Sequence, residues 1–150
     1  MKHELPQLPY EYNALEPYID TETMKIHHDK HHQAYLDKLN AVLEKYPALA
    51  DKKLEDLIKD LSSLPMEEGD RVALKNHGGG HLNHSFFWTV MGPQKQVDEA
   101  LFEEVKKTFG SVEEFKKVFS ESAKTHFASG WTWLVKDEVD KLQIYSLPNH

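Results

Sequence analysis

The sequence predicts an α+β protein with an N-terminal long-helix hairpin domain, followed by an α/β domain with an antiparallel sheet. Two long segments, at about 21–45 and about 71–91, carry apolar residues at steps of three or four, the period of a helix buried along one face. Residues 131–135 and 142–147 flank a polar turn and predict two strands. We expect domains at residues 1–92 and 93–150, the second of them incomplete.

The N-terminal half is expected to combine an irregular start with helices of unequal length. Three prolines within residues 1–19 favour extended or turn backbone over a continuous helix. A helix then follows the N-cap Thr21 and continues to about Lys45. Residues 51–62 predict a short polar helix, and residues 64–70 predict a loop.

The first long helix carries a histidine-rich run on its predicted buried face. That face comprises Met24, His27, His31, Tyr35, Leu39 and Val42. The pair His27 and His31 is therefore predicted to be buried, whereas His28 and His32 point elsewhere and are predicted to be solvated.

The second long helix is predicted from Arg71 to Met91 and ends before Gly92-Pro93. Its predicted face comprises Ala73, Asn76, Gly80, His84, Phe87 and Met91. Three consecutive glycines, Gly78 to Gly80, cost such a helix about 1 kcal/mol each relative to alanine. We therefore expect another group to approach the backbone closely at this point.

The C-terminal half is predicted to begin with two short helices. The first covers residues 97–109 and is closed by Gly110. Residues 111–114 form a capping box that opens the second, with Val112, Phe115 and Phe119 on its buried face. The two predicted strands follow after Gly130.

Composition narrows the class of protein. Hydrophobic residues make up 39% and charged residues 29% of the 150, the balance of a folded globular chain. No stretch approaches the roughly 20 apolar residues of a membrane helix, and no apolar secretory segment is present, so we expect a cytoplasmic protein with no membrane partner. The net charge of −7 argues against a nucleic-acid partner.

Histidine carries the metal-binding potential, because the absence of cysteine excludes thiolate ligands and disulfides. Histidines four residues apart on a helix share one face and can reach a common metal. His84 lies among aromatic residues on the other long helix, and a buried imidazole needs a polar partner. One transition metal between the helices would serve both, although a solvated histidine run and a satisfied core histidine remain alternative interpretations.

Four separated motifs resemble the iron/manganese superoxide dismutases, in that family's order and spacing. They are Leu5-Pro6-Gln7-Leu8-Pro9-Tyr10, His27-His28-Asp29-Lys30-His31-His32, Gly79-Gly80-His81-Leu82-Asn83-His84-Ser85-Phe86-Phe87-Trp88 and Ala128-Ser129-Gly130-Trp131-Thr132-Trp133-Leu134-Val135. The resemblance covers the whole chain. It implies a superoxide dismutase that disproportionates superoxide to dioxygen and hydrogen peroxide at a mononuclear Mn or Fe centre, one ion per chain.

The resemblance also implies roles for individual residues. His27 and His84 match two of the family's four metal ligands. His31 and Tyr35 match the pair that lines the substrate entrance and delivers protons, and Trp131 matches an aromatic residue of the pocket wall, as do Phe87 and Trp88. Gly80 is a glycine in manganese-type members and a glutamine in many iron-type members. His150 occupies the position where manganese-type members carry a glutamine near the metal-bound solvent, so the metal preference is undetermined.

Two ligands of the family site are absent from the sequence. They belong to an Asp-x-x-x-His motif, and no aspartate here is followed four residues later by histidine. The resemblance places that motif, one strand and much of the contact of a homodimer or homotetramer beyond residue 150. We therefore expect the 150 residues alone to be weakly active, since catalytic metal centres usually have at least three protein ligands.

Other functional classes are less consistent with the sequence. A di-iron carboxylate bundle needs Glu-x-x-His motifs and a zinc protease needs His-Glu-x-x-His, and the sequence contains neither. The triple glycine is not followed by the Lys-Ser/Thr of a phosphate-binding loop. The remaining alternative is a truncated, catalytically weak or inactive metal-binding member of the same fold.

Overall fold

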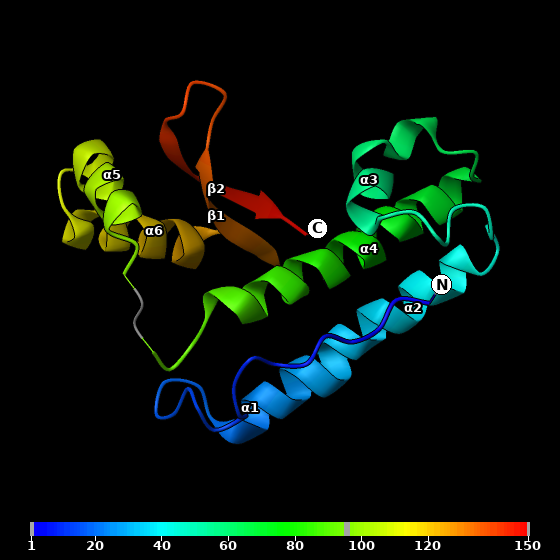
Figure 1. The fold of residues 1–150 in the computed structure, drawn as a ribbon, viewed down its shortest axis with the longest axis horizontal. Coiled ribbons are helices and arrows are strands. Elements are labelled where there is room, and N and C mark those ends of the chain that lie inside the picture. The colour runs from blue at the N-terminus through cyan, green and yellow to red at the C-terminus, as the bar shows by residue number, and fades with distance from the viewer. Residues whose placement is uncertain (1, 95–96, 150) are drawn as a thin grey trace. The chain divides into compact units, whose positions relative to one another are not determined.

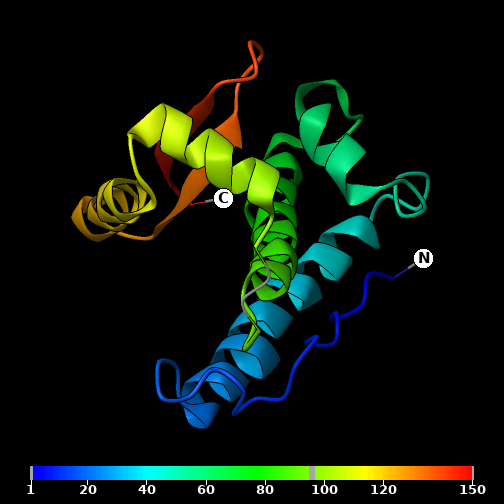
Figure 2. The ribbon, with the colours of Figure 1, turned by 60° about the vertical axis from the view of Figure 1, so that its left-hand side comes forward.

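Two long helical segments run side by side in opposite directions in the N-terminal part of the chain (Figures 1 and 2). The computed structural model describes residues 2–94 and 97–149, and it divides into two compact units, Met1–Gln94 and Lys95–His150. The fold is α+β. In chain order the elements are α1 (Thr21–Ile26), the π-helix η1 (His27–His32), α2 (Gln33–Leu43), α3 (Leu54–Lys59), the 3-10 helix η2 (Leu61–Ser63), α4 (Glu68–Val90), α5 (Glu99–Phe109), α6 (Val112–Thr125), β1 (Gly130–Lys136) and β2 (Leu142–Pro148).

The first long segment is not one regular helix, as predicted, but α1 and α2 joined by the π-helical turn η1. The N-cap is Asp20 rather than Thr21, because the Asp20 carboxylate accepts a hydrogen bond from the Thr23 backbone N–H at 2.8 Å. The Thr21 hydroxyl instead donates to Glu16 at 2.5 Å. The segment ends at Leu43, ahead of Pro47.

The π-helical turn changes which histidines are buried. His32 is 0% exposed and His28 is 5% exposed, so the prediction that both are solvated is wrong. In a π-helix each N–H bonds five residues back, so each turn contains more residues than an α-helical turn. Buried positions therefore recur every four residues, at Met24, His28, His32 and Leu36. The prediction that His27 and His31 are both buried is also wrong for His31, which is exposed, whereas His27 is partly buried.

Helix α4 begins at Glu68, inside the segment predicted to be a loop. The acidic Glu68 and Asp70 lie in its first turn, where the helix dipole favours negative charge. Asp70 also accepts hydrogen bonds from Lys45 and Tyr46 after the first long segment. The predicted face is partly wrong, because the buried residues of α4 are Leu74, Gly78, Gly79, Gly80, His81, His84 and Trp88.

The apolar core of the N-terminal unit lies where α2, α3 and α4 meet. Its buried members are Leu39, Val42, Leu43, Leu49, Leu54, Leu57, Leu64, Met66 and Leu74. Leucine dominates this core. Where η1 faces α4, in contrast, the buried residues are mainly histidines and Trp88. The N-terminal unit therefore has an apolar region that supplies packing and a polar region whose groups need partners.

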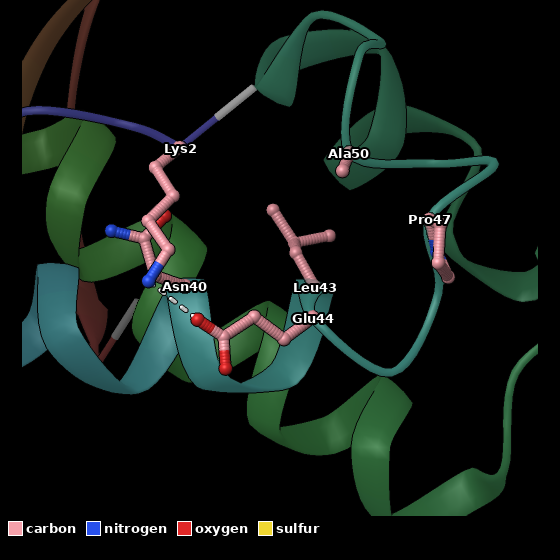
Figure 3. A pocket seen from close by; sticks show the side chains of 6 residues that line it. All are labelled: Lys2, Asn40, Leu43, Glu44, Pro47 and Ala50. Carbon is pink, nitrogen blue, oxygen red and sulfur yellow. Dashed lines mark ion pairs between the residues drawn. The ribbon is translucent and has the colours of Figure 1, made fainter.

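The N-terminal segment, residues 2–10, lies along the first long segment and is tied to it by polar contacts. The Asn40 side chain accepts from the His3 N–H at 2.9 Å and donates to the His3 carbonyl at 3.0 Å. His28 Nε2 donates to the Pro6 carbonyl at 2.8 Å. Lys2 and Glu44 form an ion pair at 2.6 Å (Figure 3). Both residues line an open hollow of about 280 Å³.

The C-terminal unit confirms the predicted order of two helices and a hairpin. Asp98 caps α5, Gly110 follows it with φ 87°, and the Ser111 hydroxyl accepts from the Glu114 N–H at 3.0 Å. Strands β1 and β2 are antiparallel, with Gly130 opposite Pro148 and Lys136 opposite Leu142. Helix α6 packs against both strands. Among the described residues, no helix combines the length and apolar character needed to cross a lipid bilayer.

Shortening Leu39 should destabilise the N-terminal unit, because its side chain is 0% exposed at the centre of the apolar core. We expect Leu39→Ala to lower the free energy of unfolding by about 2–5 kcal/mol, measured by urea denaturation. The neighbouring exposed Lys38 is the control, and Lys38→Ala should change it by no more than about 0.5 kcal/mol. Equal losses in the two variants would contradict the assigned core.

Candidate metal centre

The two long helical segments bring three histidines together. His27 and His31 come from η1 and His84 from α4, and one ring nitrogen from each lies within 4.8 Å of the others. The ring centres of His27 and His84 are 5.0 Å apart, and those of His31 and His84 are also 5.0 Å apart. His84 is buried, His27 partly buried and His31 exposed, so the cluster runs from the interior to the surface.

The hydrogen bonds of His84 determine which of its nitrogens is available. His84 Nδ1 lies 2.7 Å from the Gly80 carbonyl one turn earlier on α4. A carbonyl only accepts, so Nδ1 carries the hydrogen, and the neutral ring presents a lone pair at Nε2. That Nε2 lies 3.0 Å from Nε2 of His27. The helix thus aims a basic nitrogen of His84 at His27.

This donor set fits a first-row transition metal. Two nitrogens that are each about 2.1 Å from one ion, at roughly a right angle, lie about 3.0 Å apart. Burial lowers the pKa of His27, with His31 and His28 adding to the effect, and so favours the neutral imidazole that metals bind. His27 and His84 could therefore hold such an ion as a pair.

Tyr35 lies beside this pair against the glycines of α4. Its ring centre is 5.0 Å from that of His31 and 5.3 Å from that of His84. A Cβ added to Gly80 would come within 2.5 Å of the Tyr35 ring. The expected close approach at the triple glycine is therefore confirmed, and the approaching group is Tyr35. Gly80 has to be glycine in this packing because the Tyr35 ring occupies the space of any side chain.

Aromatic side chains enclose the inner side of the cluster. The ring centre of His27 lies 5.0 Å from Trp88 and 6.0 Å from Phe87. Trp88 is 1% exposed. On the outer side, a hollow of about 360 Å³ is lined by Thr23, Ile26, His27 and His31. The cluster thus has an apolar wall on one side and solvent access on the other.

Three further buried histidines were not predicted from the sequence, and two of them, His32 and His81, are hydrogen-bonded to each other. Trp88 Nε1 donates to His32 Nδ1 at 3.0 Å, and His32 Nε2 lies 2.8 Å from His81 Nδ1. Burial lowers the pKa of His32 to about 3 and that of His81 to about 4. The apolar recurrence at Met24 and Leu36, which brackets His28 and His32 at steps of four, was the signal that could have revealed His32.

His28 is the third buried histidine, and it connects η1 to the N-terminal segment. Its Nδ1 lies 2.7 Å from the Asp29 carboxylate, which also accepts from the Tyr12 hydroxyl at 2.6 Å. The Tyr12 hydrogen bond holds the pKa of Asp29 below its ordinary value, with His28 contributing. Both ring nitrogens of His28 are therefore used in contacts that hold the fold together, with Asp29 and with the Pro6 carbonyl.

The other two predicted site residues, Trp131 and His150, belong to the C-terminal half of the chain. Trp131 lies in β1 of the C-terminal unit, with its ring centre 6.0 Å from that of Trp133. His150 lies outside the described residues. Their predicted roles in the pocket stay predictions.

Comparison with known families agrees with the fold and with the histidine cluster. Residues 2–92 match the family profile described as iron/manganese superoxide dismutases, alpha-hairpin domain. Residues 97–150 match the profile described as iron/manganese superoxide dismutases, C-terminal domain. The chain therefore belongs to the iron/manganese superoxide dismutase family, whose members bind manganese or iron.

Adding a methyl group at Gly80 should disturb the cluster through Tyr35. We expect Gly80→Ala to destabilise the protein by about 1–3 kcal/mol, because the new Cβ overlaps the Tyr35 ring. Gly69 lies in the same helix with nothing within 4 Å of an added Cβ, so Gly69→Ala should stabilise by about 0.5–1 kcal/mol. Urea denaturation of both variants measures this difference, and a stabilised Gly80→Ala would contradict the contact.

The buried histidines should make the metal-free protein sensitive to acid. The ordinary pKa of 6.5 falls to about 4 for His81 and about 3 for His32, so the unfolded chain binds more protons than the folded chain below about pH 6.5. Stability should therefore be complete above that pH and fall progressively as the pH drops toward 4. Urea midpoints at about pH 7.5 and about pH 5 measure the loss. His81→Leu should make it smaller, and an unchanged loss would count against His81 as a source.

Proposed function

We propose that this chain provides half of a superoxide dismutase centre, in which two superoxide anions and two protons give dioxygen and hydrogen peroxide. The observation that carries the proposal is the 3.0 Å separation of His27 Nε2 and His84 Nε2, with His84 Nδ1 committed to the Gly80 carbonyl. A manganese or iron ion held there would supply the one-electron redox couple that disproportionation needs. His27 and His84 are the ligands in this proposal.

The residues around the pair have separate tasks. His31 is exposed and Tyr35 lies next to it, so these two connect solvent to the centre and can pass protons inward. Trp88 and Phe87 keep water and larger molecules from the inner side of His27. The hollow beside His27 and His31 is the entrance for the small anionic substrate.

The proposal requires further ligands. The metal cluster of the described residues consists of three imidazoles without a carboxylate. We propose that an Asp-x-x-x-His segment completes the centre, as the family resemblance implies, and that the assembled protein is a homodimer or homotetramer. The two-ligand pair His27 and His84 also favours a second candidate, a metal-binding member of the family with weak turnover, because catalytic metal centres usually have at least three protein ligands.

Removing His84 tests the ligand assignment. We expect His84→Ala to abolish retention of manganese and iron, measured by elemental analysis after dialysis, and to abolish superoxide consumption with it. His77 lies on the same helix outside the cluster, so His77→Ala is the control and should retain metal. Full metal content in His84→Ala would show that the ligand assignment is wrong.

Removing the Tyr35 hydroxyl separates proton delivery from metal binding. We expect Tyr35→Phe to keep the metal and the fold, because the ring still packs on Gly80. Turnover should fall about a hundredfold, which is the lower end of the contribution typical of a positioned proton donor. Metal content and superoxide consumption are measured on the same sample of the metal-loaded protein. Unchanged turnover in Tyr35→Phe would exclude Tyr35 from proton delivery. If the wild-type protein itself bound metal but showed no turnover, the second candidate function would be favoured.

A further inference from the structure

His32 lies directly behind the proposed ligand His84. The two rings are stacked, with centres 5.4 Å apart and planes 26° apart. His32 is 0% exposed, so its ring has no solvent partner. A flat ring in this position limits how far the His84 ring can tilt about its own side-chain bonds.

The hydrogen bonds of His32 have only one possible direction. The indole N–H of Trp88 is a donor and cannot accept, so His32 Nδ1 accepts from it at 3.0 Å. The hydrogen of the neutral His32 ring is then on Nε2, which donates to His81 Nδ1 at 2.8 Å. Both ring nitrogens are thereby occupied, and a rotation of the ring would break two buried hydrogen bonds.

We propose that His32 is a positioning residue for His84, held by the relay from Trp88 through His32 to His81, so that His84 keeps its Nδ1–H tautomer and aims Nε2 at His27. This inference rests on the proposed function in so far as His84 is a metal ligand. Partners that orient a ligating imidazole typically change metal affinity by about 10–100-fold when they are lost.

The alternative is that His32 is only a well-packed core residue. If that were so, substituting His32 would lower the stability of the protein. It would change neither the tautomer of His84 nor the affinity for metal. His81 separates the two roles, because it anchors His32 and is not part of the His27–His31–His84 cluster. Its substitution therefore reaches the metal site through His32.

A matched pair at His81 provides the test. In His81→Asn the side-chain oxygen takes the place of Nδ1 and still accepts from His32, whereas His81→Leu has a similar size and no acceptor. We expect His81→Leu to weaken Co²⁺ binding about tenfold and His32→Phe to weaken it about 10–100-fold, whereas His81→Asn stays within about twofold of wild type. Leu74→Ala, in the apolar core, controls for lost stability and should leave the dissociation constant unchanged.

Imidazole ¹⁵N spectra of the metal-free protein provide the second readout. We expect the Nδ1–H tautomer of His84 in wild type and His81→Asn, and a mixture of tautomers in His81→Leu and His32→Phe. Equal Co²⁺ affinities for the Asn and Leu variants, or an unchanged tautomer in His32→Phe, would overturn the positioning role. A wild-type chain that binds no metal would instead overturn the proposed function, and the metal-free spectra would still decide the role of His32.

Discussion

Every buried imidazole brings two polar nitrogens into the interior, and each nitrogen needs a partner because an unpaired polar group in low dielectric is costly. This constraint organises the interface between η1 and α4. His28 bonds to Pro6 and Asp29, and His32 bonds to Trp88 and His81. The N-terminal segment, the π-helical turn and α4 are held together by these contacts.

The same constraint divides the buried histidines between η1 and α4 into two groups. One group has all its hydrogen-bond partners in the protein, and the other faces the proposed metal position. In the first group, His32 has donor and acceptor partners supplied by the protein, and burial keeps its ring neutral. In the second group, the backbone of α4 satisfies His84 Nδ1, and Nε2 then faces another imidazole nitrogen on His27. The Nε2–H of His27 donates to the lone pair of His84 Nε2 at 3.0 Å. A cation bound between the two nitrogens would replace that hydrogen.

Local patterns predicted much of the fold, because caps, turns and helical spacing act within a few residues. Ser111 and Gly110 were correctly assigned as helix caps, and the glycine run correctly indicated a close approach at Gly80. The face of the first helix was predicted less well. The prediction assumed a uniform α-helical period, and the π-helical turn replaced it at His27–His32.

The sequence by itself determined that two long helices each carry histidine and that another group approaches the backbone at the glycine run. Its motifs were also specific enough to indicate the family. Only the tertiary structure decided which histidines are buried and which nitrogens face each other. Burial depends on the number of residues in a helical turn, and the α-helical period read from the sequence does not hold in the π-helical turn η1. The tautomer of His84 depends on a hydrogen bond whose geometry appears only once α4 has folded.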